Sequence, residues 1–339
     1  MFNGIGIQTI MEISKYDTWL AVILGIIIGF IPILLICYMN KKNVNFFDLI
    51  NNLFGKIFSK IFLFIVIIFL FYSLITITND FINFANVKYL FETPRIFIAI
   101  LFVIPAIIIC KKGCEALGRT GIILFIISVI IFFLNDIALI KLVKFNNLKP
   151  IYANGFMSIL KGAIYYVVYM ITPIIFLSII PKSQKSYKLY NRNLIIGYLI
   201  GSIAILVIVF YITTVYNYEY ITLFSYPAYF ILKKINYGFL ANVENIMSFF
   251  FIIDYFMTET IFLYSIYYFL GNELKLKNKK FKVISIIVTL LFIYLSVYIF
   301  KDSSLASHIS KTFYILANLF LISFILIFVP IKIKLHKKN

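Results

Sequence analysis

The sequence predicts an all-α polytopic membrane protein built as a bundle of about ten transmembrane helices. The first observation is composition: 63% of the 339 residues are hydrophobic and 13% are charged. Soluble domains typically have about 45–50% apolar and about 25% charged residues. The second is that uncharged runs of membrane-spanning length recur along the chain, and they are continuous rather than alternating, which favours helices over strands. The third is that lysine and arginine crowd into every second connecting segment.

The uncharged runs define the expected spans in chain order. Eight runs contain no Asp, Glu, Lys or Arg, and a ninth, 245–272, is interrupted by Asp254 and Glu259. A tenth, partial span is expected at the start of the chain, and the whole of 1–339 is expected to form a single transmembrane domain. The expected spans are 1–14 (partial), 18–40, 61–79, 96–110, 120–135, 162–181, 193–218, 245–272, 283–300 and 312–331.

The distribution of basic residues predicts the orientation. Of the 31 Lys and Arg residues, 20 lie in five alternate segments and 11 in the segments between them. The positive-inside rule assigns the richer set to the cytoplasm, which puts both termini on that side of the lipid bilayer. The same rule explains the net charge of +18, so no nucleic-acid partner is expected. The five segments are 41–60, 111–119, 182–192, 273–282 and 332–338.

The predicted orientation determines the side of the membrane from which the N-terminal segment enters. If the span 18–40 runs from outside to inside, residues 1–14 must arrive from the cytoplasm. A helix of that length is too short to cross about 30 Å of hydrocarbon. We therefore expect residues 1–14 to be the second half of a first helix, either because the chain lacks its natural beginning or because that helix is unusually short.

The two longest segments expected outside, 136–161 and 217–244, mix aromatic residues with lysines. Both are too long for tight turns. They are expected to form amphipathic interfacial helices or loops that cap an outer vestibule.

Two carboxylates at membrane depth are the first candidates for function. Asp254 and Glu259 lie 10 and 15 residues after Glu244, and at about 1.5 Å per residue this places them near the middle of the bilayer. Thr258 follows Asp254 by one helical turn, on a stripe that also contains Phe262. These side chains could bind a small ligand or ion, or they could make interhelical hydrogen bonds that hold the bundle together.

Polar or glycine-rich positions in three other spans complete the candidate site. Gly4 and Gly6 form a pair that can mark an unwound, ligand-binding point or close helix packing. Tyr72 and Thr76 lie in the span 61–79, and Thr172 precedes Pro173, which can break its helix. Such positions fit a transporter-type central site, and ordinary packing explains them equally well.

Cysteine and histidine usage predicts no enzyme, metal or cofactor. The chain has three cysteines and two histidines, which provide neither a disulfide framework nor zinc-ligand spacing. The sequence contains no phosphate-binding glycine loop, nucleophile elbow or nucleotide fingerprint.

Several local strings resemble the B subunits of endospore germinant receptors, the spore germination permease family. The resemblance runs over nearly the whole chain, although the family's proline after the paired glycines is absent and its usual arginine is replaced by Asn242. The strings are Asp17-Thr18-Trp19, Lys112-Gly113-Cys114-Glu115-Ala116-Leu117-Gly118-Arg119, Asn146-Asn147-Leu148-Lys149-Pro150, Ser225-Tyr226-Pro227 and Asn242-Val243-Glu244.

The resemblance implies a LeuT-like inverted-repeat fold of the amino acid–polyamine–organocation superfamily. It further implies a subunit of the spore inner membrane that senses a small nutrient, such as an amino acid, with A-type and C-type partner subunits. A cation-coupled amino-acid transporter of the same fold, with Asp254 or Glu259 holding the ion, is the alternative. The ligand-lining residues implied by the resemblance are Gly4, Gly6, Thr258 and Phe262, with Ile171 and Thr172.

Overall fold

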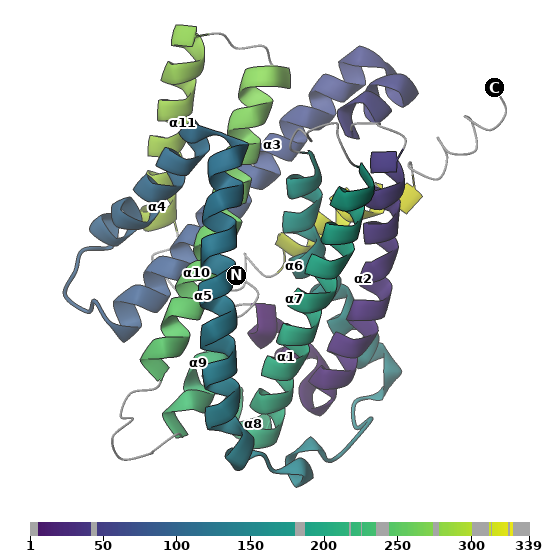
Figure 1. Ribbon diagram of the computed structural model, residues 1–339, viewed down its shortest axis with the longest axis vertical. Coiled ribbons are helices and arrows are strands. Elements are labelled where there is room, and N and C mark those ends of the chain that lie inside the picture. The colour runs from purple at the N-terminus through teal and green to yellow at the C-terminus, as the bar shows by residue number, and fades with distance from the viewer. Residues whose placement is uncertain are drawn as a thin grey trace, which may run out of the picture. The chain divides into compact units, whose positions relative to one another are not determined.

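The computed structural model of the chain is mainly helical in the residues that it describes (Figure 1). It describes residues 6–41, 46–179, 187–216, 218–224, 226–234, 244–273, 278–299, 312, 314–324 and 326–327, and no strand occurs among them. The helices are α1 (Ile7–Ser14), α2 (Thr18–Lys41), α3 (Phe46–Lys88), α4 (Arg95–Lys112), α5 (Cys114–Leu139), α6 (Gly155–Ile179), α7 (Tyr187–Val215), α8 (Tyr218–Ile221), α9 (Pro227–Phe230), α10 (Glu244–Tyr268) and α11 (Asn278–Tyr298).

Seven stretches of the described chain are long and apolar enough to cross a membrane. The predicted class, an all-α polytopic membrane protein, is therefore confirmed. The total of ten spans, the LeuT-like repeat and the single transmembrane domain stay predictions. The seven stretches are Ile7–Lys41, Gly55–Lys88, Cys114–Leu142, Gly155–Leu177, Tyr187–Val215, Ser248–Gly271 and Lys280–Tyr298.

Contacts within the chain divide it into two compact units, each assembled from three separate segments. The division falls inside α2, α5, α6, α7 and α10, so each of these helices contributes residues to both units. Unit 1 comprises Met1–Ile31, Thr120–Met170 and Arg192–Asp254, and unit 2 comprises Pro32–Arg119, Ile171–Asn191 and Tyr255–Asn339.

In unit 1, α2, α6 and α7 pack side by side (Figure 1) through a buried tyrosine and a glycine. A Cβ added to Gly25 of α2 would lie 2.6 Å from the Tyr166 ring of α6, so only glycine allows this approach. The Tyr166 hydroxyl donates to Ser202 Oγ of α7 at 2.8 Å. The Tyr198 hydroxyl of α7 donates to the Ile26 carbonyl of α2 at 2.8 Å. Each pair of the three helices is therefore joined by a specific contact.

The corner between α1 and α2 is fixed by Asp17, which ends the short 3-10 helix Lys15–Asp17. Asp17 is completely buried, and its Oδ1 accepts a hydrogen bond from the Tyr152 backbone N–H at 2.6 Å. Nearby, the Ser158 hydroxyl of α6 donates to the Ile13 carbonyl of α1 at 2.6 Å. Asp17, the first residue of the string 17–19, and Ser158 thus hold the α1–α2 corner against the start of α6 and the segment that leads into it.

The string 146–150 has a comparable structural role at the end of α7. The Thr214 carbonyl accepts two hydrogen bonds, from the Lys144 backbone N–H at 3.1 Å and from Asn147 Nδ2 at 2.8 Å. The string 112–119, by contrast, contains an exposed ion pair in the first turns of α5. The Arg119 guanidinium and Glu115 Oε1 lie 2.5 Å apart. Exposed pairs of this spacing typically contribute about 0.3–0.5 kcal/mol.

In unit 2, α3, α4 and α11 pack against one another, and Figure 1 shows them grouped together. The rings of Phe81 (α3) and Phe102 (α4) stack with centroids 3.7 Å apart. α3 is interrupted at Gly55, whose φ of 81° is not helical. Gly113, with φ 92°, makes the one-residue connection from α4 to α5. Both glycines occupy the left-handed region that other residues avoid.

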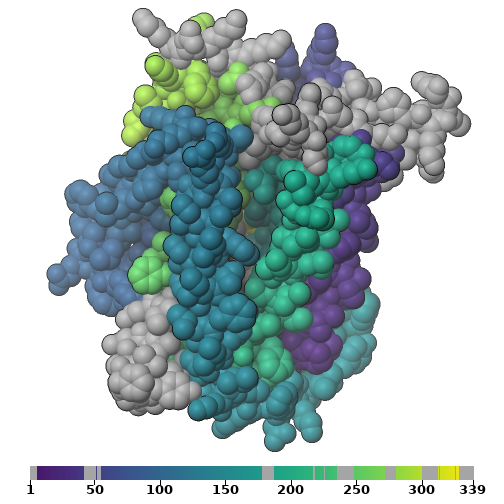
Figure 2. Space-filling model, in the orientation of Figure 1, coloured from purple at the N-terminus to yellow at the C-terminus, as the bar shows by residue number. Residues whose placement is uncertain are grey.

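Large apolar side chains are exposed along α5, which runs down the face seen in Figure 2. A soluble protein rarely exposes so extended an apolar surface, whereas a lipid-facing helix requires one. The exposed residues are Ile122, Ile123, Phe125, Ile126, Ile127, Ile130, Phe133, Leu134 and Ile137.

Candidate functional site

Buried polar side chains gather in unit 2 where α3 meets the second half of α10. Glu259 is completely buried, and the Thr78 hydroxyl donates to its Oε2 at 3.0 Å. One turn earlier on α10, the Tyr255 hydroxyl donates to Asp80 Oδ2 in a short hydrogen bond. We call Thr78, Asp80, Tyr255 and Glu259 the α3–α10 cluster.

Helical spacing explains how the cluster forms. Tyr255 and Glu259 are four residues apart, so they project from the same face of α10. Asn79, between the two α3 members, instead donates from Nδ2 to the Ser296 carbonyl of α11 at 2.8 Å. Three consecutive polar residues therefore join α3 to two different helices.

Glu259 is the member of the cluster whose hydrogen bonding is incomplete. Its Oε1 is buried and has no hydrogen-bond partner among the described residues. A charged side chain at the centre of a transmembrane helix costs about 2.5–3.5 kcal/mol on insertion scales. A buried carboxylate with one neutral donor is therefore stabilised by a cationic group placed beside it.

Aromatic side chains occur beside the cluster members along α3 and α10. The Phe81 ring lies 6.2 Å from that of Tyr255, between ring centroids. Phe262, one turn beyond Thr258, meets Phe176 of α6 in a T-shaped arrangement with centroids 5.5 Å apart. Low polarity strengthens any electrostatic interaction made at Glu259.

Unit 2 contains seven of the ten predicted site residues. Six of these are buried and the seventh, Tyr72, is half-buried. The Thr76 hydroxyl bonds to the Ser73 carbonyl of its own helix at 2.9 Å, so it is turned along α3. The role of all seven in ligand binding stays a prediction. They are Tyr72, Thr76, Ile171, Thr172, Thr258, Glu259 and Phe262.

The other three predicted residues belong to unit 1. Gly4 lies outside the described residues, and Gly6 is buried with a helical backbone (φ −60°, ψ −54°) just before α1. Asp254 is half-buried, and the boundary between the units falls directly after it. Asp254 and Thr258 therefore belong to different units although they are one turn apart, and a shared site stays a prediction.

Asn79, Asp80 and Tyr255 are the residues that sequence reasoning missed. The expected span ended at residue 79 because Asp80 follows it, whereas α3 continues to Lys88. A usable signal was present, because residues 81–87 again carry no charge. An isolated acid between two apolar stretches is a candidate for an intramembrane position.

The oxygen atoms at Glu259 suit a small cationic group. In the part of the chain that the structure describes, no three His, Cys, Asp or Glu side chains lie together as a metal site. Hydroxyl and carboxylate oxygens can instead accept a proton or an ammonium group.

These features define the class: a polytopic helical membrane protein with an ionisable cluster buried at membrane depth. A family model described as "Spore germination protein" matches residues 5–304. The chain therefore belongs to the spore germination protein family, and the family predicted from the sequence strings is confirmed.

Two relatives come from Bacillus subtilis (strain 168). YfkT, whose name assigns it provisionally to spore germination, is 27% identical over 256 residues, which cover 71% of this chain and 67% of YfkT. Spore germination protein KB is 27% identical over 164 residues, which cover 45% of this chain and 42% of that protein. The match to protein KB thus spans less than half of either chain.

Proposed function

We propose that this chain is the membrane subunit of a nutrient germinant receptor, located in the spore inner membrane with both termini in the cytoplasm. It binds a small nutrient, an amino acid, within the membrane and passes the signal to A-type and C-type partner subunits. Binding acts by favouring one conformation over another, so no covalent chemistry is required.

Family membership supports this proposal, and so does the relationship to a protein named for spore germination. The observation that carries the ligand-binding part is the buried Glu259, whose Oε1 has no partner among the described residues. The ammonium group of an amino acid would supply the missing donor, and the hydroxyl of Thr258 lies on the same helix, one residue before Glu259.

Restoring this chain to spores that lack germinant receptors tests the receptor function. In spores that lack other germinant receptors, restoring this chain with its partner subunits should restore germination to at least one amino acid. Spores that stay dormant with every amino acid, despite normal amounts of the protein, would contradict the proposal.

Thr258→Ala tests the site, with Thr260→Ala as the matched control. The Thr260 hydroxyl bonds to the Phe256 carbonyl of its own helix at 2.7 Å, so it is already satisfied along α10. We expect Thr258→Ala to raise the nutrient concentration for half-maximal germination about fivefold to tenfold, the loss of about one hydrogen bond. Equal responses from the two variants would remove Thr258 from the site.

A cation-coupled amino-acid transporter is the second candidate, and the same Glu259 favours it. A buried carboxylate, with one oxygen that has no hydrogen-bond partner among the described residues, could carry a coupling proton. Uptake of labelled amino acid into vesicles that is lost in Glu259→Gln or Asp254→Asn would support transport. Binding without uptake in the unmodified chain would exclude it.

A further inference from the structure

Two basic residues flank the turn between α3 and α4 in unit 2 (Figure 1), Lys88 at the end of α3 and Arg95 at the start of α4. The stacked rings of Phe81 and Phe102 fix the register of this helical hairpin. Lys88 lies seven residues after Phe81, and Arg95 lies seven residues before Phe102. Seven residues are about two helical turns, or about 10 Å. The two cations therefore lie at the same level, on the faces through which the helices meet.

Hydrogen bonds to α3 hold the backbone of this turn. Asn86 Nδ2 donates to the Leu90 carbonyl at 2.8 Å and to the Thr93 carbonyl at 3.2 Å. The Ala85 carbonyl accepts a hydrogen bond from the Leu90 backbone N–H at 2.9 Å. Because these bonds tie both ends of the turn to α3, the main chain at Arg95 is held in place.

The Arg95 guanidinium has one edge without hydrogen-bond partners. Nε and Nη2 are buried, and neither atom has a partner among the described residues. Their N–H groups point in parallel, and this edge matches two oxygens of a carboxylate or a phosphate group. No ion pair to Arg95 occurs in the part of the chain that the structure describes, and Glu92, the acid in the turn, is exposed. An unpaired charged donor is costly inside a fold, so an oxyanion would stabilise this end of α4.

The surface beside the two cations is apolar. Four residues there, Val87, Leu90, Phe91 and Phe97, expose between 40% and 70% of their area. Exposed apolar residues next to basic ones are typical of the boundary between hydrocarbon and headgroups, where long basic side chains extend toward lipid phosphates. Arg95 is half-buried, so part of its side chain reaches this surface. A lipid phosphate is therefore better placed to meet Arg95 than an anion dissolved in water.

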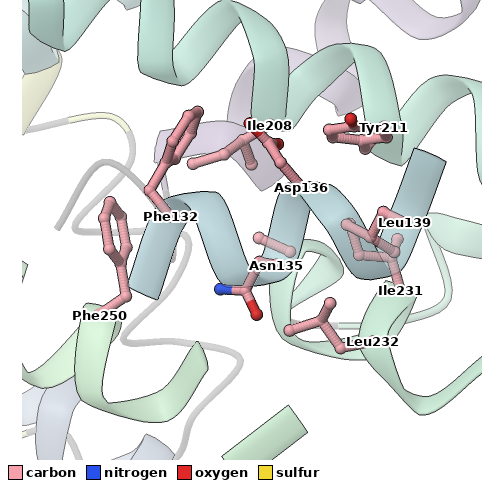
Figure 3. A pocket seen from close by; sticks show the side chains of 10 residues that line it. Phe132, Asn135, Asp136, Leu139, Ile208, Tyr211, Ile231, Leu232 and Phe250 are labelled. Carbon is pink, nitrogen blue, oxygen red and sulfur yellow. The ribbon is translucent and has the colours of Figure 1, made fainter. Parts of the chain in front are cut away.

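The pocket at the end of α5 in unit 1 offers no comparable site (Figure 3). Asp136 is the charged residue among the ten that line it. The space inside it that a water molecule can occupy is about 20 Å³. This is room for about one water, so neither a lipid headgroup nor an amino acid fits there.

We propose that Lys88 and Arg95 form a binding site for the phosphate group of an anionic phospholipid. Arg95 turns its free edge toward the surface and donates two parallel hydrogen bonds to phosphate oxygens, while Lys88 supplies a second positive charge at the same level. The bound phosphate satisfies both nitrogens that lack partners in the structure described. The predicted orientation puts this site in the outer leaflet. The site is separate from the α3–α10 cluster, and the proposal does not depend on the receptor function proposed above.

The test uses the purified full chain in phosphatidylcholine nanodiscs that contain a trace of phosphatidylglycerol with a photoactivatable headgroup. After illumination, mass spectrometry measures how much lipid is attached to residues 88–97. We expect Arg95→Gln to reduce this labelling about fivefold to tenfold, because a surface cation and its two hydrogen bonds are lost. Lys161→Gln, which removes an exposed cation on the same predicted side, should leave the labelling unchanged. Equal labelling of all three proteins would overturn the proposal.

Competition distinguishes a lipid phosphate from a dissolved oxyanion. At constant ionic strength, replacing chloride with acetate or inorganic phosphate should leave the labelling unchanged, because the membrane holds the lipid phosphate at the site. Displacement of the probe by either dissolved anion would overturn the assignment to a lipid. A phosphatidylcholine probe with the same photoactivatable group should label residues 88–97 at least about threefold less. Equal labelling by the two probes would overturn the preference for an anionic headgroup.

Arg95→Lys separates the parallel hydrogen bonds from the charge, since lysine keeps the charge but lacks the flat edge with two nitrogens. We expect labelling about threefold below that of the unmodified chain. Lys88→Gln should lower labelling by a similar factor while Arg95 stays in place, so it keeps the test decisive if the Arg95 variants do not fold. Unchanged labelling of folded Arg95→Lys or Lys88→Gln protein would overturn the proposed geometry.

Discussion

Replacing Gly162 with alanine should separate α6 from the α1–α2 corner. A Cβ at position 162 would lie 2.9 Å from Ala21 Cβ and 3.2 Å from Ser14 Cβ, and it would also collide with the Ser14 hydroxyl. Ser14 and Ala21 are completely buried. The Ala21 methyl group cannot rotate away, so the helices themselves must move apart. Such overpacking typically costs about 1–3 kcal/mol.

Gly197→Ala is the matched control for this change. Gly197 lies inside α7, and a Cβ there would meet nothing within 4 Å. Both substitutions gain the same intrinsic helix propensity, about 0.8–1.0 kcal/mol. The difference between the variants therefore isolates the steric cost, and Gly162→Ala should be less stable than Gly197→Ala by about 1–3 kcal/mol.

The assay is unfolding of the purified full chain in detergent by titration with sodium dodecyl sulfate. The chain has one tryptophan, Trp19, which lies two residues before Ala21 and therefore reports on the α1–α2 corner. The midpoint of its fluorescence transition should fall for Gly162→Ala relative to Gly197→Ala. Identical midpoints would refute the close packing at Gly162.

Three further predictions concern the corner, the loop before α6 and the orientation. Asp17→Ala should lower the free energy of unfolding by about 0.5–1.5 kcal/mol, because the hydrogen bond from the Tyr152 backbone N–H to the buried Asp17 side chain is lost; an unchanged midpoint in the same titration would contradict this. Asn147→Ala should lower it by about 0.5–1.5 kcal/mol, because one of two hydrogen bonds to the Thr214 carbonyl is lost; stability equal to that of the unmodified chain would exclude this contribution. Cys114 is exposed whereas the other two cysteines are buried, so a membrane-impermeant maleimide should label it from the cytoplasmic side only, with Cys114→Ser as the blank. Labelling from the outside would reverse the predicted orientation.

The helices could be predicted from the sequence because burial in lipid demands long uncharged runs. The expected span 18–40 nearly coincides with α2, and 120–135 lies within α5. The ends of the helices were less predictable where a polar residue occurs inside a helix. Asp80 suggested the end of a span, but its hydrogen bond with Tyr255 allows α3 to continue to Lys88. That partner is 175 positions away in sequence, so local composition could not reveal it.

The candidate site was predictable only in part, for the same reason. Glu259 stood out because an acid in an apolar run is rare and costly. Its contact with Thr78 depends on how α3 and α10 pack, which spacing along one helix does not specify. The pocket at Asp136 was not predicted, because its lining comes from segments spread between residues 132 and 250. Asp136 itself looked like the ordinary end of a span.

The proposed nutrient-sensing function is tested most directly by the germination of spores that carry Glu259→Gln. Glu115→Gln is the control, because the Glu115 side chain is 75% exposed and pairs only with Arg119 on the surface of α5 among the described residues. With equal amounts of protein, Glu259→Gln should need at least tenfold more nutrient for half-maximal germination, a loss of about 1.4 kcal/mol, whereas Glu115→Gln should respond normally. A normal dose–response in Glu259→Gln spores would contradict a ligand site at the α3–α10 cluster.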